Sequence, residues 1–184
     1  MALRLTLAGL LLAFATICEA AGEPATVTQE RIKAAFLYKF AGYVEWPASA
    51  FADATSPIVI GVAGSRPVAE GLEQAVAGKR LGERALRVRR LASGERRCDG
   101  CHILFVARDV DRDRAAELLA AAHGKPQLTV TDGEGEHPPG SIIHFVVAED
   151  RVRFDISREE ESQQGLRLAS PLLSVARNVK GKAP

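Results

Sequence analysis

The strongest chemical signal in the sequence is a pair of cysteines followed by a histidine. Residues 98–102 read Cys-Asp-Gly-Cys-His, and Cys-x-x-Cys-His is the pattern at which c-type haem is attached. Haem attachment calls for a helix after the motif, whereas residues 103–106, Ile-Leu-Phe-Val, are typical of a strand. The sole methionine is Met1, which would be removed together with an N-terminal signal peptide, so no methionine would remain to bind the iron. The pattern therefore argues against haem.

Two other chemistries remain for Cys98 and Cys101. In a thioredoxin-like site the first cysteine begins a helix, which lowers its pKa, but this pair precedes a strand, so catalytic exchange is disfavoured. In an oxidising compartment the two thiols would instead form a structural disulfide. Closing so short a loop stabilises the fold by roughly 2 kcal/mol. We expect this disulfide; a bond across so few residues could also be easily reduced and respond to redox conditions.

A glycine-containing turn at residues 61–65, Gly-Val-Ala-Gly-Ser, is predicted to join a strand to a helix. Free backbone N–H groups at the start of a helix can bind a phosphate or a carboxylate. The turn lacks the spacing of the dinucleotide fingerprint and the lysine of the phosphate loop, so an ordinary βα turn is the simpler interpretation. Gly64, Ser65 and Arg66 are the candidate residues if this turn binds a small anion or an aromatic metabolite.

No catalytic or metal site emerges from the other polar residues. His123 is expected at the end of a helix, His137 in a loop and His144 in a strand, and none has a clear metal-binding partner. Three glutamates at residues 159–161 are predicted to form a solvated first helical turn, which favours negative charge. A Gly-x-Ser-x-Gly motif does not occur. The sequence predicts no metal, no cofactor and no enzymatic activity.

The N-terminus has the pattern of a secretory signal. Arg4 precedes an apolar run over residues 5–17, and small residues follow it. Glu19 ends the run before it reaches the length of about 20 residues needed to cross a membrane. We therefore predict a signal peptide over residues 1–20 and a mature protein in the periplasm; a lipoprotein anchored at Cys18 is the weaker alternative.

Charge excludes one class of partner. The formal net charge is +1, and the arginines between residues 84 and 97 are not interleaved with aromatic residues. Those arginines are therefore predicted to be a solvated strand face and loop, and nucleic-acid binding is not expected.

Helices and strands alternate along the exported chain. Apolar residues at every fourth position from Ile32 to Val44 predict a helix capped by Thr26 that ends near Trp46. Residues 152–156 alternate apolar and polar side chains, which predicts a strand near a sheet edge with Asp155 on its wet face. Further strands are expected at residues 58–62, 85–91, 103–106, 128–130 and 142–147, and helices at residues 65–78, 111–123, 157–165 and 170–179, the last capped by Ser170.

This order of elements predicts the fold class. Strands separated by helices form a parallel sheet, and the last two strands, joined by Glu149 and Asp150, form a hairpin. We expect one three-layer α/β domain over residues 26–179, with a mostly parallel sheet flanked by helices, a C-terminal antiparallel hairpin and two C-terminal helices. Residues 180–184 are too polar and too short to pack, and are expected to form a disordered tail.

Several segments, which together cover nearly all of the exported chain, occur in an order that is specific as a set. The first is Ile-Lys-Ala-Ala-Phe-Leu-Tyr-Lys-Phe at residues 32–40, followed by Tyr-Val-Glu-Trp-Pro at residues 43–47. The others lie at residues 101–106, 128–132, 140–143, 152–156 and 165–173. In this ordered set the chain resembles the YfiR-like family of periplasmic proteins.

The resemblance implies a function. It implies a parallel-sheet α/β homodimer that inhibits an inner-membrane diguanylate cyclase by binding its periplasmic part, which lowers cyclic-di-GMP and biofilm formation. It also implies an OmpA-like outer-membrane lipoprotein that sequesters the inhibitor. Cys101 matches the family's cysteine before a strand and Cys98 is its local partner, whereas the family's later cysteine pair has no counterpart here.

The resemblance and the predicted helices suggest where a partner would bind. Tyr43 and Trp46 are candidates to contact the partner, and the alternative is that they pack in the hydrophobic core at the end of a helix. The alternative for the protein as a whole is a module that binds a small ligand at the turn described above. The candidate contact residues are Tyr43, Trp46, Pro47, Arg158, Gln164 and Arg167.

Overall fold

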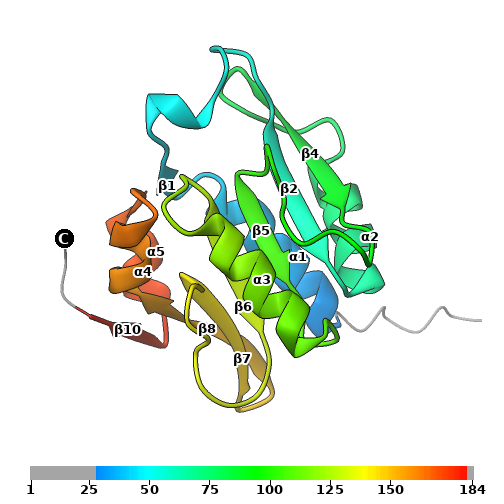
Figure 1. Ribbon diagram of the computed structural model, residues 1–184, viewed down its shortest axis with the longest axis vertical. Coiled ribbons are helices and arrows are strands. Elements are labelled where there is room, and N and C mark those ends of the chain that lie inside the picture. Colours follow the sequence, from blue (N-terminus) through cyan, green and yellow to red (C-terminus); the bar gives the residue numbers. More distant parts are fainter. Residues whose placement is uncertain (1–27, 182–184) are drawn as a thin grey trace, which may run out of the picture.

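Short, nearly continuous apolar runs form the middle of one eight-stranded sheet, because both of its faces are covered. In the computed structural model, which describes residues 28–181, the strand order is β10-β8-β7-β6-β5-β2-β4-β3 (Figure 1). The predicted mostly parallel α/β fold is confirmed. Five adjacent strands run parallel to one another: β4 (Arg84–Arg90), β2 (Ile58–Ala63), β5 (Ile103–Val106), β6 (Leu128–Asp132) and β7 (Ile143–Ala148).

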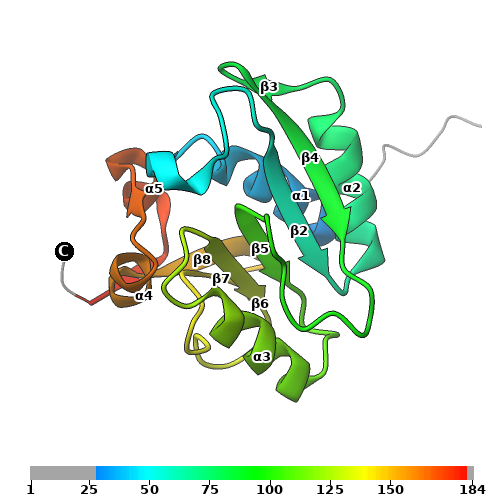
Figure 2. The same ribbon diagram turned by 45° about the horizontal axis from the view of Figure 1, so that its top comes forward.

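Helices cover the two faces of the sheet, as the three-layer prediction requires. Helices α1 (Gln29–Phe40) and α2 (Arg66–Val76) lie on one face, and α3 (Arg112–Ala122) lies on the other (Figures 1 and 2). The larger apolar cluster fills the α1 and α2 side. A smaller cluster on the α3 side contains Cys98 and Cys101 together with Leu118 of α3. The disulfide loop therefore belongs to the α3 layer.

Helix α1 is anchored by aromatic rings and by one buried ion pair. The ring of Phe36 lies 5.5 Å from that of Phe154, and Phe40 lies 5.7 Å from Phe145, between centroids. Aromatic pairs at such distances add about 1 kcal/mol each to the area they bury. From the same helix Lys33 pairs with Asp132 at the end of β6, and both side chains are at least nine-tenths buried. These contacts fix α1 across three neighbouring strands.

Strand β8 (Arg151–Ser157) pairs antiparallel with β7, which confirms the predicted hairpin. Its turn residues Glu149 and Asp150 have φ values of 52° and 57°, the left-handed geometry of a tight hairpin. The prediction that Asp155 lies on a wet face is wrong, because the residue is only 4 % exposed. Its carboxylate accepts hydrogen bonds from Arg177, one of them 2.8 Å long. This ion pair takes the place of the hydrogen bonds to water that the carboxylate loses on burial.

The C-terminal segment differs from the prediction after Gly165. Helix α4 (Arg158–Gln163) lies within the predicted helix, and the chain beyond Gly165 forms β9 (Arg167–Leu168), α5 (Ser170–Val175) and β10 (Asn178–Lys180). The predicted helix over residues 170–179 is wrong beyond Val175, because β10 pairs in parallel with β8 and carries Val179 and Lys180. Arg177 N donates to the carbonyl of Phe154 (2.8 Å) and so directs the chain onto the sheet edge. Ser170 is not the cap: Ala169 occupies that position without a side-chain hydrogen bond.

Helix α1 also ends earlier than predicted. It stops at Phe40 instead of near Trp46, because the chain turns at Gly42 and enters β1 (Val44–Glu45). Strand β1 pairs antiparallel with β9 and is followed by the short helix η1 (Ala48–Ala50). Strand β3 (Arg80–Leu81), which pairs antiparallel with β4, was not predicted.

Some predictions fall outside residues 28–181. These are the signal peptide over residues 1–20, the Thr26 cap and the last residues of the tail. Within the described part, Thr28 caps α1 by accepting a hydrogen bond from Arg31 N (3.3 Å). No helix between residues 28 and 181 is long and apolar enough to cross a membrane.

Candidate functional site

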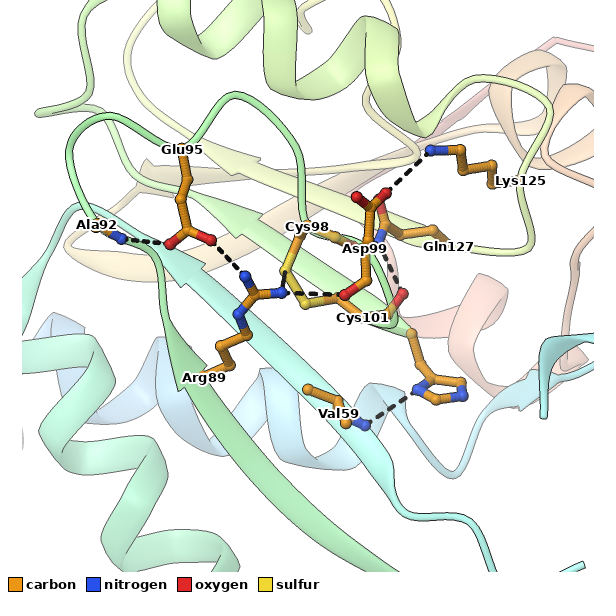
Figure 3. Close-up of a disulfide and its surroundings, with 10 residues drawn as sticks. Val59, Arg89, Ala92, Glu95, Cys98, Asp99, Cys101, Lys125 and Gln127 are labelled. Carbon is orange, nitrogen blue, oxygen red and sulfur yellow. Dashed lines mark hydrogen bonds and ion pairs between the residues drawn. A yellow bond between two sulfur atoms is a disulfide. The ribbon is translucent and has the colours of Figure 1, made fainter. Parts of the chain in front are cut away.

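The predicted bond between Cys98 and Cys101 is present, and its sulfurs are enclosed by the fold. The two residues are 4 % and 6 % exposed. Gln127 Nε2 donates to both of their carbonyl oxygens, at 2.9 and 2.7 Å (Figure 3). A strand, not a helix, follows the motif. Buried sulfurs outside a helix N-terminus lack the access that exchange catalysis requires, so the geometry supports a structural bond.

Gly61 in β2 is the residue that allows the disulfide to lie against the sheet. A Cβ atom at this position would lie 2.5 Å from Cys98 Sγ and 2.8 Å from Cys101 Sγ. Real Cβ atoms do not approach sulfur this closely, and the two sulfurs are bonded to each other, so they cannot separate to make room. A glycine in the middle of a strand often marks such a close approach.

Charged groups hold the loop between β4 and the disulfide. Arg89 pairs with Glu95 and donates to the carbonyl of Asp99 (3.0 Å), while Glu95 also accepts from Ala92 N (2.7 Å) (Figure 3). The Asp99 carboxylate lies 3.6 Å from Lys125 Nζ. These groups are partly exposed, and exposed ion pairs contribute at most about 1 kcal/mol each. Their effect is to set the path of the loop.

His102 links this loop to the segment that follows β1. Its Nδ1 accepts a hydrogen bond from Val59 N (3.1 Å), so Nε2 is the donor to the carbonyl of Ala50 (3.0 Å). The imidazole stacks on Phe51 with 4.6 Å between centroids. Burial lowers the pKa of His102, and the nearby Arg84 lowers it further, against the opposing effect of the Ala50 carbonyl. His102 is therefore a neutral structural residue.

A second candidate surface is built by β1 and β9, which are far apart in the sequence. Val44 lies opposite Leu168 and Glu45 opposite Arg167, and Ala169 N donates to the carbonyl of Tyr43 (2.8 Å). This pairing brings four of the predicted contact residues into one region beside α5 (Figure 1). We call this surface the β1–β9 face and define it by Tyr43, Glu45, Trp46, Pro47 and Arg167.

The aromatic residues of the β1–β9 face have different roles. Tyr43 is 39 % exposed, and Leu81, itself 40 % exposed, packs against the neighbouring Gly42: a Cβ there would lie 3.5 Å from its methyl group. Trp46 is half-buried and donates from Nε1 to the carbonyl of Ala41 (3.2 Å), with its ring 6.3 Å from that of Phe51. Tyr43 and Leu81 are thus available to a partner, whereas Trp46 is held against Ala41 and Phe51.

Two predicted contact residues have other functions. Gln164 is 2 % exposed and donates from Nε2 to Thr129 Oγ1 (3.1 Å), so its side chain is unavailable to a partner and that prediction is corrected. Arg158 is mostly buried and pairs with Glu161 at 3.0 Å. Glu161 was predicted to be solvated, but it is fully buried and accepts from Leu168 N (2.6 Å). Together these groups attach α4 to β9 and so position Arg167.

The turn at Gly64 is filled by the chain itself. Ser65 N, one of the groups expected to bind an anion, donates to both carboxylate oxygens of Asp109 (3.0 Å each). Gly64 has a φ of 76°, and a Cβ on it would lie 2.3 Å from Asp109 Oδ1. Arg66 points instead to Glu70 (2.6 Å). Asp109 therefore occupies the position of the expected ligand, which corrects the prediction of a ligand site at this turn.

A buried polar cluster that the sequence did not reveal lies between β6 and β7. Thr131 Oγ1 forms 2.8 Å hydrogen bonds with Ser141 Oγ and with His144 Nδ1, and the His144 ring lies 5.5 Å from that of His137. Burial and the neighbouring His137 lower the pKa of His144 to about 4. Within residues 28–181 no group of three or more histidine, cysteine or acidic residues could hold a metal ion.

Sequence reasoning missed two kinds of residue. Leu81 and Val175 are exposed apolar residues, 40 % and 61 % accessible; single exposed apolar residues are ordinary on protein surfaces, so their residue type carries no signal of exposure. Glu161 and Gln164 are buried polar residues, and the helical pattern of α4 gave no sign of the backbone groups that they satisfy. A glutamate three residues after the N-terminal Arg158 of α4 was the one available signal.

Comparison with known proteins identifies one family. A family model described as YfiR/HmsC-like matches residues 30–177, which is nearly all of the described chain. A search of curated proteins found no match.

Proposed function

We propose that this chain, which belongs to the YfiR/HmsC-like family of periplasmic diguanylate cyclase regulators, inhibits an inner-membrane diguanylate cyclase by binding its periplasmic sensor part. Binding would hold the sensor in an inactive arrangement and so lower cyclic-di-GMP and biofilm formation. The family is regulatory rather than catalytic, which agrees with a site built from structural bonds and exposed contact residues.

The observation that supports this proposal is the composition of the β1–β9 face. Tyr43 presents an exposed aromatic ring, and Arg167 has a side chain that is 72 % exposed. Tyrosine and arginine are the residue types that most often dominate binding energy at protein interfaces. Arg167 lies 3.9 Å from Glu45, an exposed contact that would cost little to exchange for a partner's carboxylate.

The β1–β9 face is also rigidly supported. Glu161 holds the backbone of β9 through Leu168 N, and Trp46 is fixed by the carbonyl of Ala41. A preorganised surface loses less side-chain and loop entropy on binding. Helix α5 lies beside this surface (Figure 1) and carries the exposed Val175. We therefore place the cyclase contact on the β1–β9 face and the adjoining exposed side of α5, which replaces the earlier assignment to Arg158 and Gln164.

The proposal is tested by capture of the partner from an envelope extract. The exported chain, immobilised in its oxidised form, should retain a membrane diguanylate cyclase that mass spectrometry identifies. The variants Tyr43→Ala and Arg167→Glu should each retain much less of it. Arg151→Glu is the matched control, because Arg151 is also exposed but lies at the β7–β8 turn. Equal retention by all three variants would reject the β1–β9 face, and no retained cyclase in any sample would reject the function.

Two further parts of the proposal rest on the family resemblance. We propose that the protein is a homodimer, which sedimentation of the exported chain would test. We also propose that an OmpA-like outer-membrane lipoprotein sequesters it. Repeating the capture after reduction of Cys98 and Cys101 would show whether redox conditions control binding; because the sulfurs are buried, we expect retention to be unchanged by mild reductant.

A further inference from the structure

The last strand, β10, lies at the edge of the sheet and is tied to it by one buried carboxylate (Figure 1). All three residues of β10 are exposed, so apolar burial contributes little to holding the strand. Arg177, just before the strand, donates to the Asp155 carboxylate of β8 from Nε (2.8 Å) and from Nη2 (2.5 Å). Asn178 Nδ2 donates to the same carboxylate (3.3 Å). We call Asp155, Arg177 and Asn178 the β10 clasp.

Two histidines lie beside the β10 clasp. In the register of β7 with β8, His144 is directly opposite Asp155, so the two side chains are neighbours on one face of the sheet. Asp155 is in turn opposite Asn178 of β10. His137, in the loop between β6 and β7, has its ring centroid 5.5 Å from that of His144. The two imidazoles therefore continue the row of polar groups that attaches β10.

Hydrogen bonds show which nitrogen of each ring carries the proton. Ser141 Oγ donates to the carbonyl of Ile143 (2.8 Å) and so accepts from Thr131 Oγ1 (2.8 Å). Thr131 Oγ1 then accepts from His144 Nδ1 (2.8 Å), which leaves Nε2 of that ring without a proton. His137 Nε2 donates to the Ser141 carbonyl (2.6 Å), which leaves its Nδ1 without a proton. Both remaining nitrogens are buried, and no group in the described part of the chain forms a hydrogen bond with them. A second proton on either ring would thus be buried without an acceptor.

The charges around the two rings are arranged so that a proton on either ring would disturb the β10 clasp. Burial is the main cause that lowers the pKa of both histidines, and it outweighs the attraction of nearby carboxylates. Two of those carboxylates, Asp132 and Asp155, are already in ion pairs. The cations that act on the rings, Arg177 and Lys180, both belong to the β10 segment. The charged groups around the rings are Asp132 on β6, Glu134 and Glu136 in the loop, Asp155 on β8, Glu160 on α4, and Arg177 and Lys180 at β10.

We propose that the β10 clasp is an acid-sensitive switch: proton uptake by His137 or His144, during transient opening of the β10 segment, creates a cation that competes with Arg177 for Asp155 and keeps β10 detached from β8. Detachment uncovers the edge of β8, and a free sheet edge can pair with a strand of another chain. The switch concerns β10 and not the β1–β9 face, so its test does not depend on the proposed function.

The direction of the response follows from proton linkage. The closed state holds both histidines below their ordinary pKa of 6.5, so the detached state binds the proton more readily. Strand β10 should therefore stay attached above pH 6.5 and detach as the pH falls below it. A single histidine with a pKa of about 4 when buried and 6.5 when solvated raises the detached fraction at pH 5 by at least about tenfold.

Hydrogen exchange of the exported chain, followed by mass spectrometry at pH 7.5 and at pH 5, tests the switch once the intrinsic exchange rate at each pH has been divided out. We expect the protection of residues 176–181 to fall at least about tenfold at pH 5, while β5 in the middle of the sheet keeps its protection. Unchanged protection of β10, or an equal loss of protection in β5, would overturn the proposal.

Variants then identify the groups that carry the response. Glutamine keeps an N–H donor but does not take up a proton, so the double variant His137→Gln/His144→Gln should lose the acid response of β10. His123→Gln is the matched control, because His123 is exposed at the end of α3, and it should respond as the wild type does. An acid response of full size in the double variant would contradict the assignment of the switch to these histidines.

Arg177→Gln covers the case in which the double histidine variant is poorly folded. It removes the ion pair of the β10 clasp, so β10 should already be about tenfold less protected at pH 7.5, since hydrogen bonds between charged groups contribute at least that factor. Arg153→Gln, exposed on β8, is its control and should leave the protection of β10 unchanged. Wild-type protection of β10 in Arg177→Gln would show that the clasp does not hold the strand and would refute the switch.

Discussion

Replacing Gly61 by alanine tests how the disulfide is accommodated against the sheet. The added Cβ would lie 2.5 and 2.8 Å from the sulfurs of Cys98 and Cys101. These atoms are bonded to each other, and their carbonyls are held by Gln127. Neither the strand nor the disulfide loop can therefore move without losing hydrogen bonds. We expect Gly61→Ala to destabilise the native state through overpacking.

The size of this effect follows from the contacts. Overpacking by a single carbon in a rigid core costs about 2 kcal/mol. Replacing both cysteines by alanine removes the two sulfurs, and in that background the nearest atom to the new methyl group is the flexible end of Leu91, at 3.2 Å. There Gly61→Ala should be neutral or stabilising by about 0.5 kcal/mol, because alanine restricts the unfolded chain. The coupling between the two sites is then about 2 kcal/mol.

A double-mutant cycle measures this coupling. Urea unfolding of the wild type, Gly61→Ala, the Cys98→Ala/Cys101→Ala pair and the combined variant gives the four free energies of unfolding. The cysteine replacements alone should lower stability by about 2 kcal/mol, the loop-closure contribution of so short a bridge. If Gly61→Ala costs the same with and without the sulfurs, then the close approach at Gly61 does not explain the glycine.

Three other predictions concern buried ionisable groups. The His144 pKa of about 4 lies below its unfolded value of 6.5, so the unfolded chain binds the proton first as the pH falls. The free energy of unfolding, measured with urea, should therefore be constant above pH 6.5 and fall by about 3 kcal/mol as the pH drops to 4. A flat profile over this range would contradict the burial of a neutral His144. Glu161→Gln should lower the free energy of unfolding by about 3 kcal/mol, because Arg158 would be left without its buried partner, whereas the exposed control Glu159→Gln should change it by less than about 0.5 kcal/mol. Lys33→Met should lower the free energy of unfolding by about 3 kcal/mol, because it leaves the buried Asp132 carboxylate unpaired. Lys39→Met, at an exposed position of the same helix, should change it little. Equal effects of the two variants in thermal unfolding would refute the importance of the ion pair.

The parts of the fold that the sequence predicts are those with their own periodicity. Strands β2, β5 and β7 are short apolar runs, and α2 and α3 carry apolar residues at helical spacing with clear N-caps. Each of these signals lies within a single segment and reflects burial on both sheet faces or on one helix face. The order of the elements then suffices for the parallel sheet.

The parts that were missed depend on contacts distant in the sequence. Val44 continues the four-residue spacing of α1 and is buried, yet it lies in a strand whose partner, Leu168, is more than a hundred positions away. Strand β10 likewise exists because β8 offers an edge and Asp155 binds Arg177. Strands of two or three residues have no periodicity of their own, so their positions follow from tertiary hydrogen bonds.

The candidate site was predicted in part for the same reason. The spacing of the two cysteines within residues 98–102 predicts the disulfide. Tyr43 and Arg167 were predicted as contact residues and lie in segments that the fold brings together. Gln164 was misassigned because a polar residue in a polar helix is expected to face water, whereas its amide satisfies buried groups between β6 and the Gly140 turn. A buried polar group is identified by its partners, and these lie in other segments.

The most direct test of the proposed inhibition is the cyclic-di-GMP content of cells that lack this protein. Deletion should raise cyclic-di-GMP, and the exported wild type or the Arg151→Glu control should restore the lower level, whereas Tyr43→Ala/Arg167→Glu, produced in equal amount, should not. An unchanged cyclic-di-GMP content after deletion would contradict inhibition of a cyclase, and full restoration by the double variant would contradict its binding through the β1–β9 face.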